Sequence, residues 1–314
     1  MRRALTQPEQ QRYRLLADQF DAARKERDLE TTKRKIAELT KILRPAGNEA
    51  KLNKFKLFYF ELALELGETE KAAKGFMGIR RLTPENRRTH LEATFLLALC
   101  KLRLGEIAEA KLLVAKVMGN EDVIKSLPRR VEFKKMVRQR FAEESLLAHM
   151  KDLGHEHIDP EKLAENAAKL AKNTQAKLFE SLGDAAPGEA VLFMRGMDAF
   201  TLKQLPYNER LLLGQHCENH ESKKLGSALF DAFKRQLYEA FCNPKCDAYK
   251  SFYDRPLKGL AWGSPIAAQL VQYLKSQGMS WWSLAVPLGA LIIKLGVNTL
   301  CQYHAPKGVM VDRR

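Results

Sequence analysis

The apolar residues in the first half of the chain return at three- and four-residue intervals. This period holds through most of residues 10–150, and it predicts a series of amphipathic helices that each bury one face. Glycine and proline interrupt the pattern and mark turns, at Pro45-Ala46-Gly47, Gly67, Pro84, Gly105 and Pro128. Segments of roughly 12–18 residues joined by short turns favour antiparallel helix pairs. The pattern therefore predicts an all-α fold.

The periodicity breaks within residues 151–160, which predicts a boundary between a domain at 1–150 and a second helical domain at 151–314. Asp159 followed by Pro160 is a typical helix start, with an N-cap and a proline in the first turn. One apolar stripe then continues to Leu182 and predicts a single helix. Further helices are expected at about 209–220 and 224–241.

Two short motifs in the first domain look alike. Leu66-Gly67-Glu68 and Leu104-Gly105-Glu106 each end one helix and begin the next, and the two glycines lie 38 residues apart, within the range of helical repeats. Small residues would let the paired helices approach closely, while a proline would stop the second helix. With the two glycines, the residues that fit this pattern are Ala72, Phe76, Leu82, Pro84, Ala98 and Ala110.

These residues resemble the tetratricopeptide-type repeat over about 53–118. The match departs from the family at Tyr59-Phe60, where a Leu-Gly pair is typical, and at Lys101, which occupies a usual aromatic position. The resemblance implies stacked helical hairpins that offer an extended concave surface to a protein partner. The alternative is an irregular helical bundle whose hairpins look alike.

The C-terminal domain contains the most apolar segment of the chain, at 281–301, where only Lys294 is charged. Its length and its Trp281-Trp282 pair fit a membrane helix. Pro287 and Gly289 split it, which favours a buried core helix instead. A preceding apolar stretch at 265–274 is expected to pair with it in either case.

The tail also shows a faint similarity to C-terminal helical modules of bacterial defence and conflict proteins. The residues that carry it run from Cys242-Asn243-Pro244 through Lys294-Leu295-Gly296-Val297 to Cys301. The similarity implies a membrane-associated component of a defence system as one possible role.

The formal net charge of +15 indicates an acidic partner, either a protein, a nucleic acid or an anionic membrane. The densest basic cluster covers 125–140, where Arg130, Lys134 and Arg138 follow one another at four-residue steps and could contact phosphates. The other interpretation is a solvated helix face that flanks an apolar stripe. The full cluster is Lys125, Arg129, Arg130, Lys134, Lys135, Arg138 and Arg140.

The repeat-like segment would carry its own basic surface. Its candidate contact residues for a protein or nucleic-acid partner are Lys54, Lys56, Arg80, Arg81, Arg87 and Arg88.

Cysteine usage argues for a reducing compartment, since the five cysteines are odd in number and sparse. Residues 1–8 lead into no apolar core, so no signal peptide is expected and the predicted location is cytoplasmic. Cys217 with His220, and Cys242 with Cys246, form a weak zinc hypothesis. The simpler interpretation is that Cys217 and Cys242 are free, buried, apolar side chains.

No phosphate loop, dinucleotide fingerprint or nucleophile elbow occurs in the sequence, so neither enzymatic activity nor a cofactor is expected. The sequence favours a non-enzymatic helical adaptor that binds a protein partner through a basic repeat surface. The alternatives are a nucleic-acid-binding subunit that uses the 125–140 helix and the membrane-associated defence component.

Overall fold

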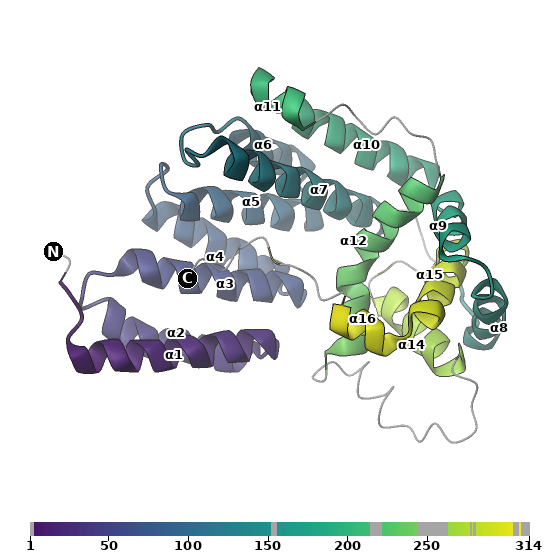
Figure 1. The fold of residues 1–314 in the computed structure, drawn as a ribbon, viewed down its shortest axis with the longest axis horizontal. Coiled ribbons are helices and arrows are strands. Elements are labelled where there is room, and N and C mark those ends of the chain that lie inside the picture. Colours follow the sequence, from purple (N-terminus) through teal and green to yellow (C-terminus); the bar gives the residue numbers. More distant parts are fainter. Residues whose placement is uncertain are drawn as a thin grey trace. The chain divides into compact units, whose positions relative to one another are not determined.

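The fold is all-α, as the periodicity predicts (Figure 1). The computed structural model describes residues 3–151, 156–213, 222–243, 263–276, 278, 281–303 and 308. Over these residues every regular element is a helix.

The chain divides into two compact units, and each is described by itself. Unit 1 comprises residues 1–137, 204–209 and 308–314, and unit 2 comprises 138–203 and 210–307. One boundary between the units falls inside helix α7 (Leu127–Lys151), after residue 137. The first part of this helix belongs to unit 1 and the second part to unit 2.

Unit 1 consists of helical hairpins that stack in chain order (Figure 1). Within each pair the two helices pack on each other, and α2 packs on α3 and α4 on α5 across successive pairs. The helices are α1 (Gln7–Lys25), α2 (Leu29–Leu43), α3 (Glu49–Glu65), α4 (Thr69–Leu82), α5 (Arg88–Arg103) and α6 (Ile107–Met118), followed by the first part of α7.

Three hairpins of unit 1 close with the same turn. Gly67 and Gly105 have φ angles of 86° and 77°, and Arg27 occupies the equivalent position between α1 and α2 with a φ of 56°. In each turn the residue after the left-handed one donates its N–H to a carbonyl five residues back: Asp28 to Ala23, Glu68 to Ala63 and Glu106 to Lys101. This bond satisfies a helix-end carbonyl, as in a Schellman cap. The α1–α2 turn was not foreseen because its left-handed residue is an arginine.

The core of unit 1 depends on small residues at helix contacts. Ala72, Ala98 and Ala110 have no exposed surface, and every residue of α5 from Leu91 to Leu102 except Lys101 is buried. A helix buried on all sides lies at the centre of its domain. The central position of α5 explains its weak amphipathic pattern.

Unit 2 contains most of the second half of the chain. Its helices are α8 (Pro160–Leu170), α9 (Gln175–Asp184), α10 (Gly188–Lys203), α12 (Ser222–Cys242), α14 (Gly263–Ser276), α15 (Trp282–Leu295) and α16 (Val297–Tyr303), with the second part of α7. The short helix α11 (Tyr207–Leu212) spans the division after Glu209. The helix expected at 209–220 corresponds to α11, which ends at Leu212, and residues 214–220 lie outside the described residues.

The predicted single helix from Pro160 to Leu182 is wrong. Asp159 does cap α8, since its carboxylate accepts hydrogen bonds from the N–H groups of Glu161 and Lys162. However, α8 ends at Leu170, and the hydroxyl of Thr174 caps the new helix α9 by accepting from the N–H of Lys177. The apolar period continues across the break, so periodicity alone could not reveal it.

Helices α9 and α12 cross with their backbones in contact. A Cβ on Gly183 would overlap the carbonyl of Ser222, and a Cβ on Gly226 would overlap the carbonyl of Phe179. Glycine is the one residue that permits such an approach. This crossing fixes one side of the core of unit 2.

The apolar segment 281–301 forms two helices that belong to this core. Helix α15 buries Leu288, Leu291 and Ile292, and Gly296, with a φ of 77°, separates it from α16. Helix α14 packs against α15, and both contact α8. Over the described residues, no helix combines the length and apolar character needed to span a membrane.

A disulfide joins Cys242 at the end of α12 to Cys301 in α16. The expectation that Cys242 is a free, buried apolar side chain is therefore wrong. The sequence offered no basis for the pairing, because the two cysteines lie 59 residues apart. Cys100 is free and buried.

Candidate functional site

Cations stacked on aromatic rings line the odd-numbered helices of unit 1. The guanidinium of Arg24 in α1 lies 4.6 Å from the ring centroid of Phe58 in α3, and the ammonium of Lys54 lies 5.7 Å from the same ring. The guanidinium of Arg88 in α5 lies 5.2 Å from the ring of Phe133 in α7. We call Arg24, Lys54, Phe58, Arg88 and Phe133 the cation–aromatic row.

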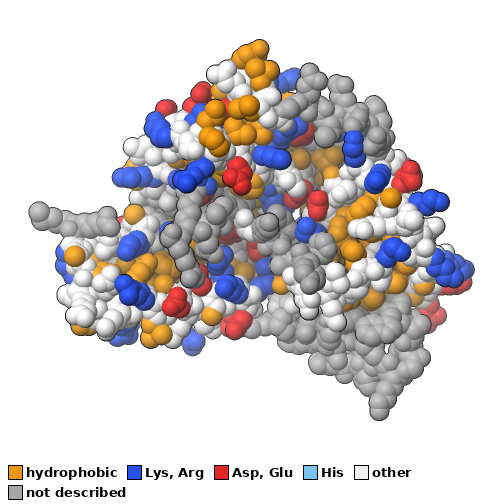
Figure 2. Space-filling view, in the orientation of Figure 1, with side chains coloured by type: hydrophobic (Ala, Val, Ile, Leu, Met, Phe, Trp, Pro, Cys, Tyr) orange, Lys and Arg blue, Asp and Glu red, His pale blue; other side chains and the backbone are white. Residues whose placement is uncertain are grey.

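The rings of the row are buried while its arginines reach solvent. Phe58 and Phe133 are each 4% exposed, whereas the side chains of Arg24 and Arg88 are 21% and 19% exposed. A guanidinium over the face of an aromatic ring is attracted by the ring's electrons. Figure 2 shows Lys and Arg side chains interleaved with hydrophobic ones on the part of unit 1 formed by α1 and α3.

A buried carboxylate joins two cations of the row. The Nε of Arg88 lies 2.7 Å from Oε1 of Glu92, and Lys54 also acts on this carboxylate electrostatically. Burial raises the pKa of Glu92, while Arg88 and Lys54 act to lower it. Glu92 therefore connects α3 and α5 through charge, and an incoming anion would compete with it.

Two further acidic residues of α3 have contacts with other parts of unit 1. Arg27 forms an ion pair of 2.9 Å with Glu65, which links the α1–α2 turn to α3. Glu61 is 5% exposed, and the backbone of Gly308 lies against it, since a Cβ at 308 would stand 3.1 Å from both carboxylate oxygens. Helix α3 is thus tied through carboxylates to the α1–α2 turn and to residue 308.

A cavity of about 990 Å³ opens beside the α3–α4 turn. Phe60, Leu66 and Leu104 supply its apolar surface, while Lys71 and Lys74 supply charge. Phe60 also packs on Gly75, leaving no space there for a larger residue. The cavity is broad and open, so it suits an extended segment better than an enclosed small molecule.

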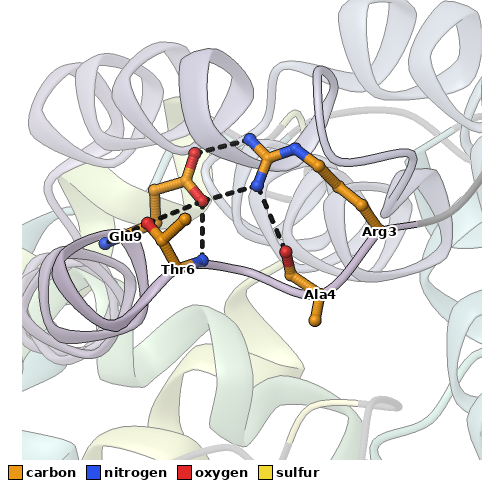
Figure 3. Close-up of polar contacts among 4 residues, drawn as sticks. All are labelled: Arg3, Ala4, Thr6 and Glu9. Carbon is orange, nitrogen blue, oxygen red and sulfur yellow. Dashed lines mark hydrogen bonds and ion pairs between the residues drawn. The ribbon is translucent and has the colours of Figure 1, made fainter.

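A smaller cavity of about 460 Å³ lies beside the N-terminal segment, with Arg3, Asn48 and Lys51 in its lining. Figure 3 shows that Arg3 is held by both oxygens of Glu9, at 2.6 and 2.7 Å. Glu9 also accepts from the N–H of Thr6 and completes the capping box of α1. The hydrogen bond from Arg3, with that from Thr6, lowers the pKa of Glu9 to about 2. The arrangement is a helix start and not an open anion site.

The other candidate contact residues of the repeat-like segment lie apart from the row. Lys56 and Arg80 are partly buried, and Arg81 and Arg87 are exposed. Burial lowers the pKa of Arg80. Of the six residues proposed from sequence, Lys54 and Arg88 are thus the two that the structure brings together in the row.

The predicted phosphate-contact row on α7 faces inward. Lys134 is 1% exposed, and its ammonium lies 2.5 Å from the carboxylate of Glu209, which also pairs with Arg130. Burial lowers the pKa of Lys134, and Glu209 opposes that effect. These cations are therefore paired inside unit 1.

The same holds for the basic residues of α7 in unit 2. Arg138 forms a two-bond pair with Asp198 at 2.5 and 2.8 Å. Arg140 is 5% exposed and lies 2.6 Å from Glu144. The exposed members of the predicted cluster are Lys125, Arg129 and Lys135.

The weak zinc set is incomplete in the structure. Cys242 is used by the disulfide, and Cys217, His220 and Cys246 lie outside the described residues. Among the residues that are described, no group of three or more His, Cys, Asp or Glu side chains could hold a metal ion.

Sequence reasoning missed Arg24, Phe58, Glu92 and Phe133 as parts of one surface. The available signal was the recurrence of basic and aromatic residues on alternate helices, which becomes visible only once the helices are paired. Comparison of the chain with protein-family models, with curated proteins and with solved structures finds no match.

Proposed function

We propose that the protein is a non-enzymatic adaptor that binds an acidic segment of a protein partner along the cation–aromatic row. The row is the observation that carries this function. Arg24, Lys54 and Arg88 come from three successive odd-numbered helices. An extended ligand crossing these helices would meet one cation at each.

The row suits a carboxylate-rich peptide for two reasons. The aromatic rings orient the cations in advance, so less side-chain entropy is lost on binding. The arginines are partly exposed and can still donate hydrogen bonds to a planar carboxylate. The net charge of +15 would speed the approach of an acidic partner.

Glu92 sets the strength of the interaction. Because it already shares Arg88 and Lys54, a ligand carboxylate must replace part of that pairing. Binding through the row should therefore be moderate and salt-dependent. Glu92→Gln should strengthen it, which is an effect opposite to that of removing a cation.

The test uses fluorescein-labelled random peptides rich in Glu and Asp, with binding followed by anisotropy on the full chain. Lys54→Glu with Arg88→Glu should weaken binding by about tenfold or more, and Glu92→Gln should strengthen it severalfold. The matched control is Lys33→Glu with Lys41→Glu, which makes the same charge change on exposed residues of α2. Equal losses in the two double variants would show attraction to net charge alone and contradict the proposal.

The nucleic-acid alternative depends on the 125–140 segment. Three of its cations, Arg130, Lys134 and Arg138, are already paired with carboxylates, so fewer remain to release counterions from phosphates. A salt titration with random duplex and single-stranded probes separates the two functions. A steep salt slope that Lys125→Glu with Arg129→Glu abolishes would favour the nucleic-acid function.

No specific observation on the described residues favours the membrane-associated defence role.

A further inference from the structure

The Cys242–Cys301 disulfide fastens the last described helix of unit 2. The Cα atoms lie 5.4 Å apart, and the bond connects the final residue of α12 to α16. Both cysteines are partly exposed, whereas Cys100 has no exposed surface. A small thiol can therefore reach the bond without unfolding the unit.

Helix α16 is short and packs on α12 and α15. It contains seven residues and follows Gly296, whose φ of 77° ends α15. Its buried apolar side chains are Val297, at 7% exposure, and Leu300, at 0%. A helix this short is not stable alone in water, so its position depends on the covalent bond together with its packing on α12 and α15.

The end of α12 also has a hydrogen bond that does not involve α16. The side-chain amide of Gln269 in α14 donates a hydrogen bond of 3.1 Å to the carbonyl of Ala240. Phe241 and Leu237, in the last turns of α12, are fully buried. Opening the disulfide would thus loosen α16 while leaving α12 in place.

We propose that Cys242–Cys301 is a site of thiol–disulfide exchange that acts as a redox-controlled clasp on α16. The co-reactant is a dithiol. One of its thiolates attacks a sulfur of the bond and releases the other cysteine as a thiolate, which takes up a proton. Its second thiolate then displaces the first cysteine, so the protein gains two thiols as the dithiol becomes a disulfide. Two electrons and two protons are transferred.

The closed form is the resting state. It is the form that the structure contains, with the bond joining the end of α12 to α16. The clasp should close again when the co-reactant is supplied in its disulfide form, which takes up the two electrons as the exchange runs in reverse.

Hydrogen–deuterium exchange on the full, oxidised chain tests the clasp. Adding dithiothreitol without denaturant should accelerate exchange of the amides in 297–303 by about tenfold or more, with 282–295 and 222–242 nearly unchanged. Replacing the reductant with oxidised glutathione, which accepts the two electrons, should restore protection. Cys301→Ser should show fast exchange in both conditions, and Cys100→Ala should respond as the wild type does.

Peptide mapping after alkylation identifies the bond itself. A cross-linked pair containing Cys242 and Cys301 is expected before reduction. Linkage of either cysteine to Cys217 or Cys246 would overturn the proposal, as would free thiols at both positions. A bond that dithiothreitol opens only in denaturant, or an α16 whose exchange ignores reduction, would make the disulfide purely structural and would equally overturn it.

Discussion

Gly183 of α9 and Gly226 of α12 face each other where the two helices cross, and a Cβ on Gly226 would stand 2.9 Å from the backbone nitrogen of Gly183. Replacing Gly226 with alanine requires one backbone to move, because the obstacle is not a flexible side chain. We expect Gly226→Ala to lower the free energy of unfolding by about 3 kcal/mol. Urea denaturation followed by circular dichroism measures the change.

Gly196 in α10 provides the control for this crossing. A Cβ there would meet no atom within 4 Å, so Gly196→Ala should be neutral or stabilising by roughly 0.5–1 kcal/mol. If Gly226→Ala were as mild as Gly196→Ala, the close approach of α9 and α12 would be wrong.

The glycine turns of unit 1 should respond to alanine in the opposite way from a helical glycine. Gly105 has a φ of 77°, and a side chain in that conformation costs about 1–2 kcal/mol. Gly78 lies within α4 with open space around it, and alanine there should stabilise by about 0.5–1 kcal/mol. Thermal unfolding of both variants is the measurement. The same sign for both changes would count against the left-handed turn.

The stability of unit 2 should depend on pH through Glu143. Burial raises the pKa of this carboxyl to about 7, against the effects of Arg140 and of a 2.9 Å hydrogen bond from Gln139, while Glu144 and Asp231 add to the rise. Since the folded pKa exceeds the unfolded value of 4.5, the folded state binds the proton more tightly. Stability is therefore highest below pH 4.5 for this group and declines as pH rises through 7.

The expected loss from Glu143 is about 2–3 kcal/mol between pH 4.5 and pH 8. Glu143→Gln should remove this dependence and make the protein more stable than the wild type at pH 8. Glu132→Gln, a change at an exposed position of α7, should leave the profile intact. Denaturation midpoints across pH 4.5–8 decide the matter, and parallel profiles for wild type and Glu143→Gln would refute the assignment.

Removing Glu209 should destabilise unit 1, because it leaves the buried Lys134 and the partly buried Arg130 without their shared carboxylate. We expect Glu209→Gln to cost about 3–5 kcal/mol. Asp122→Asn serves as the contrast, since Asp122 pairs with Lys125 where the side chains are 89% and 81% exposed. That change should stay within about 0.5 kcal/mol. Chemical denaturation distinguishes the two, and a cost for Glu209→Gln no larger than for Asp122→Asn would exclude the buried pairing.

Local sequence signals predicted the helices and several of their ends. Gly67, Gly105 and Asp159 act through their own backbone or nearest neighbours, so they can be recognised without the fold. The role of Lys134 could not be recognised in that way, since its partner Glu209 lies 75 residues away. A four-residue spacing of cations on a helix looks the same whether the face meets solvent or a carboxylate from another helix.

The candidate site was predictable in part for the same reason. Lys54 and Arg88 stood out as basic residues in a repeat-like segment, but their connection through Glu92 requires α3 and α5 to be adjacent. Phe58 and Phe133 looked like ordinary core residues. Their second role is to form cation–π contacts with Arg24 and Arg88. This role depends on tertiary packing alone.

The three matching turns at Arg27, Gly67 and Gly105 mark equivalent backbone positions in unit 1, between which a helical segment could be added. A copy of the segment from 67 to 104 begins and ends at equivalent backbone positions, so it could be inserted after Leu104 without changing how either neighbouring turn closes. Lengthening unit 1 in this way would add a helix to the odd-numbered side, with copies of Arg88 and Glu92. Under the proposed function, the number of hairpins would then set how far the surface reaches along a partner.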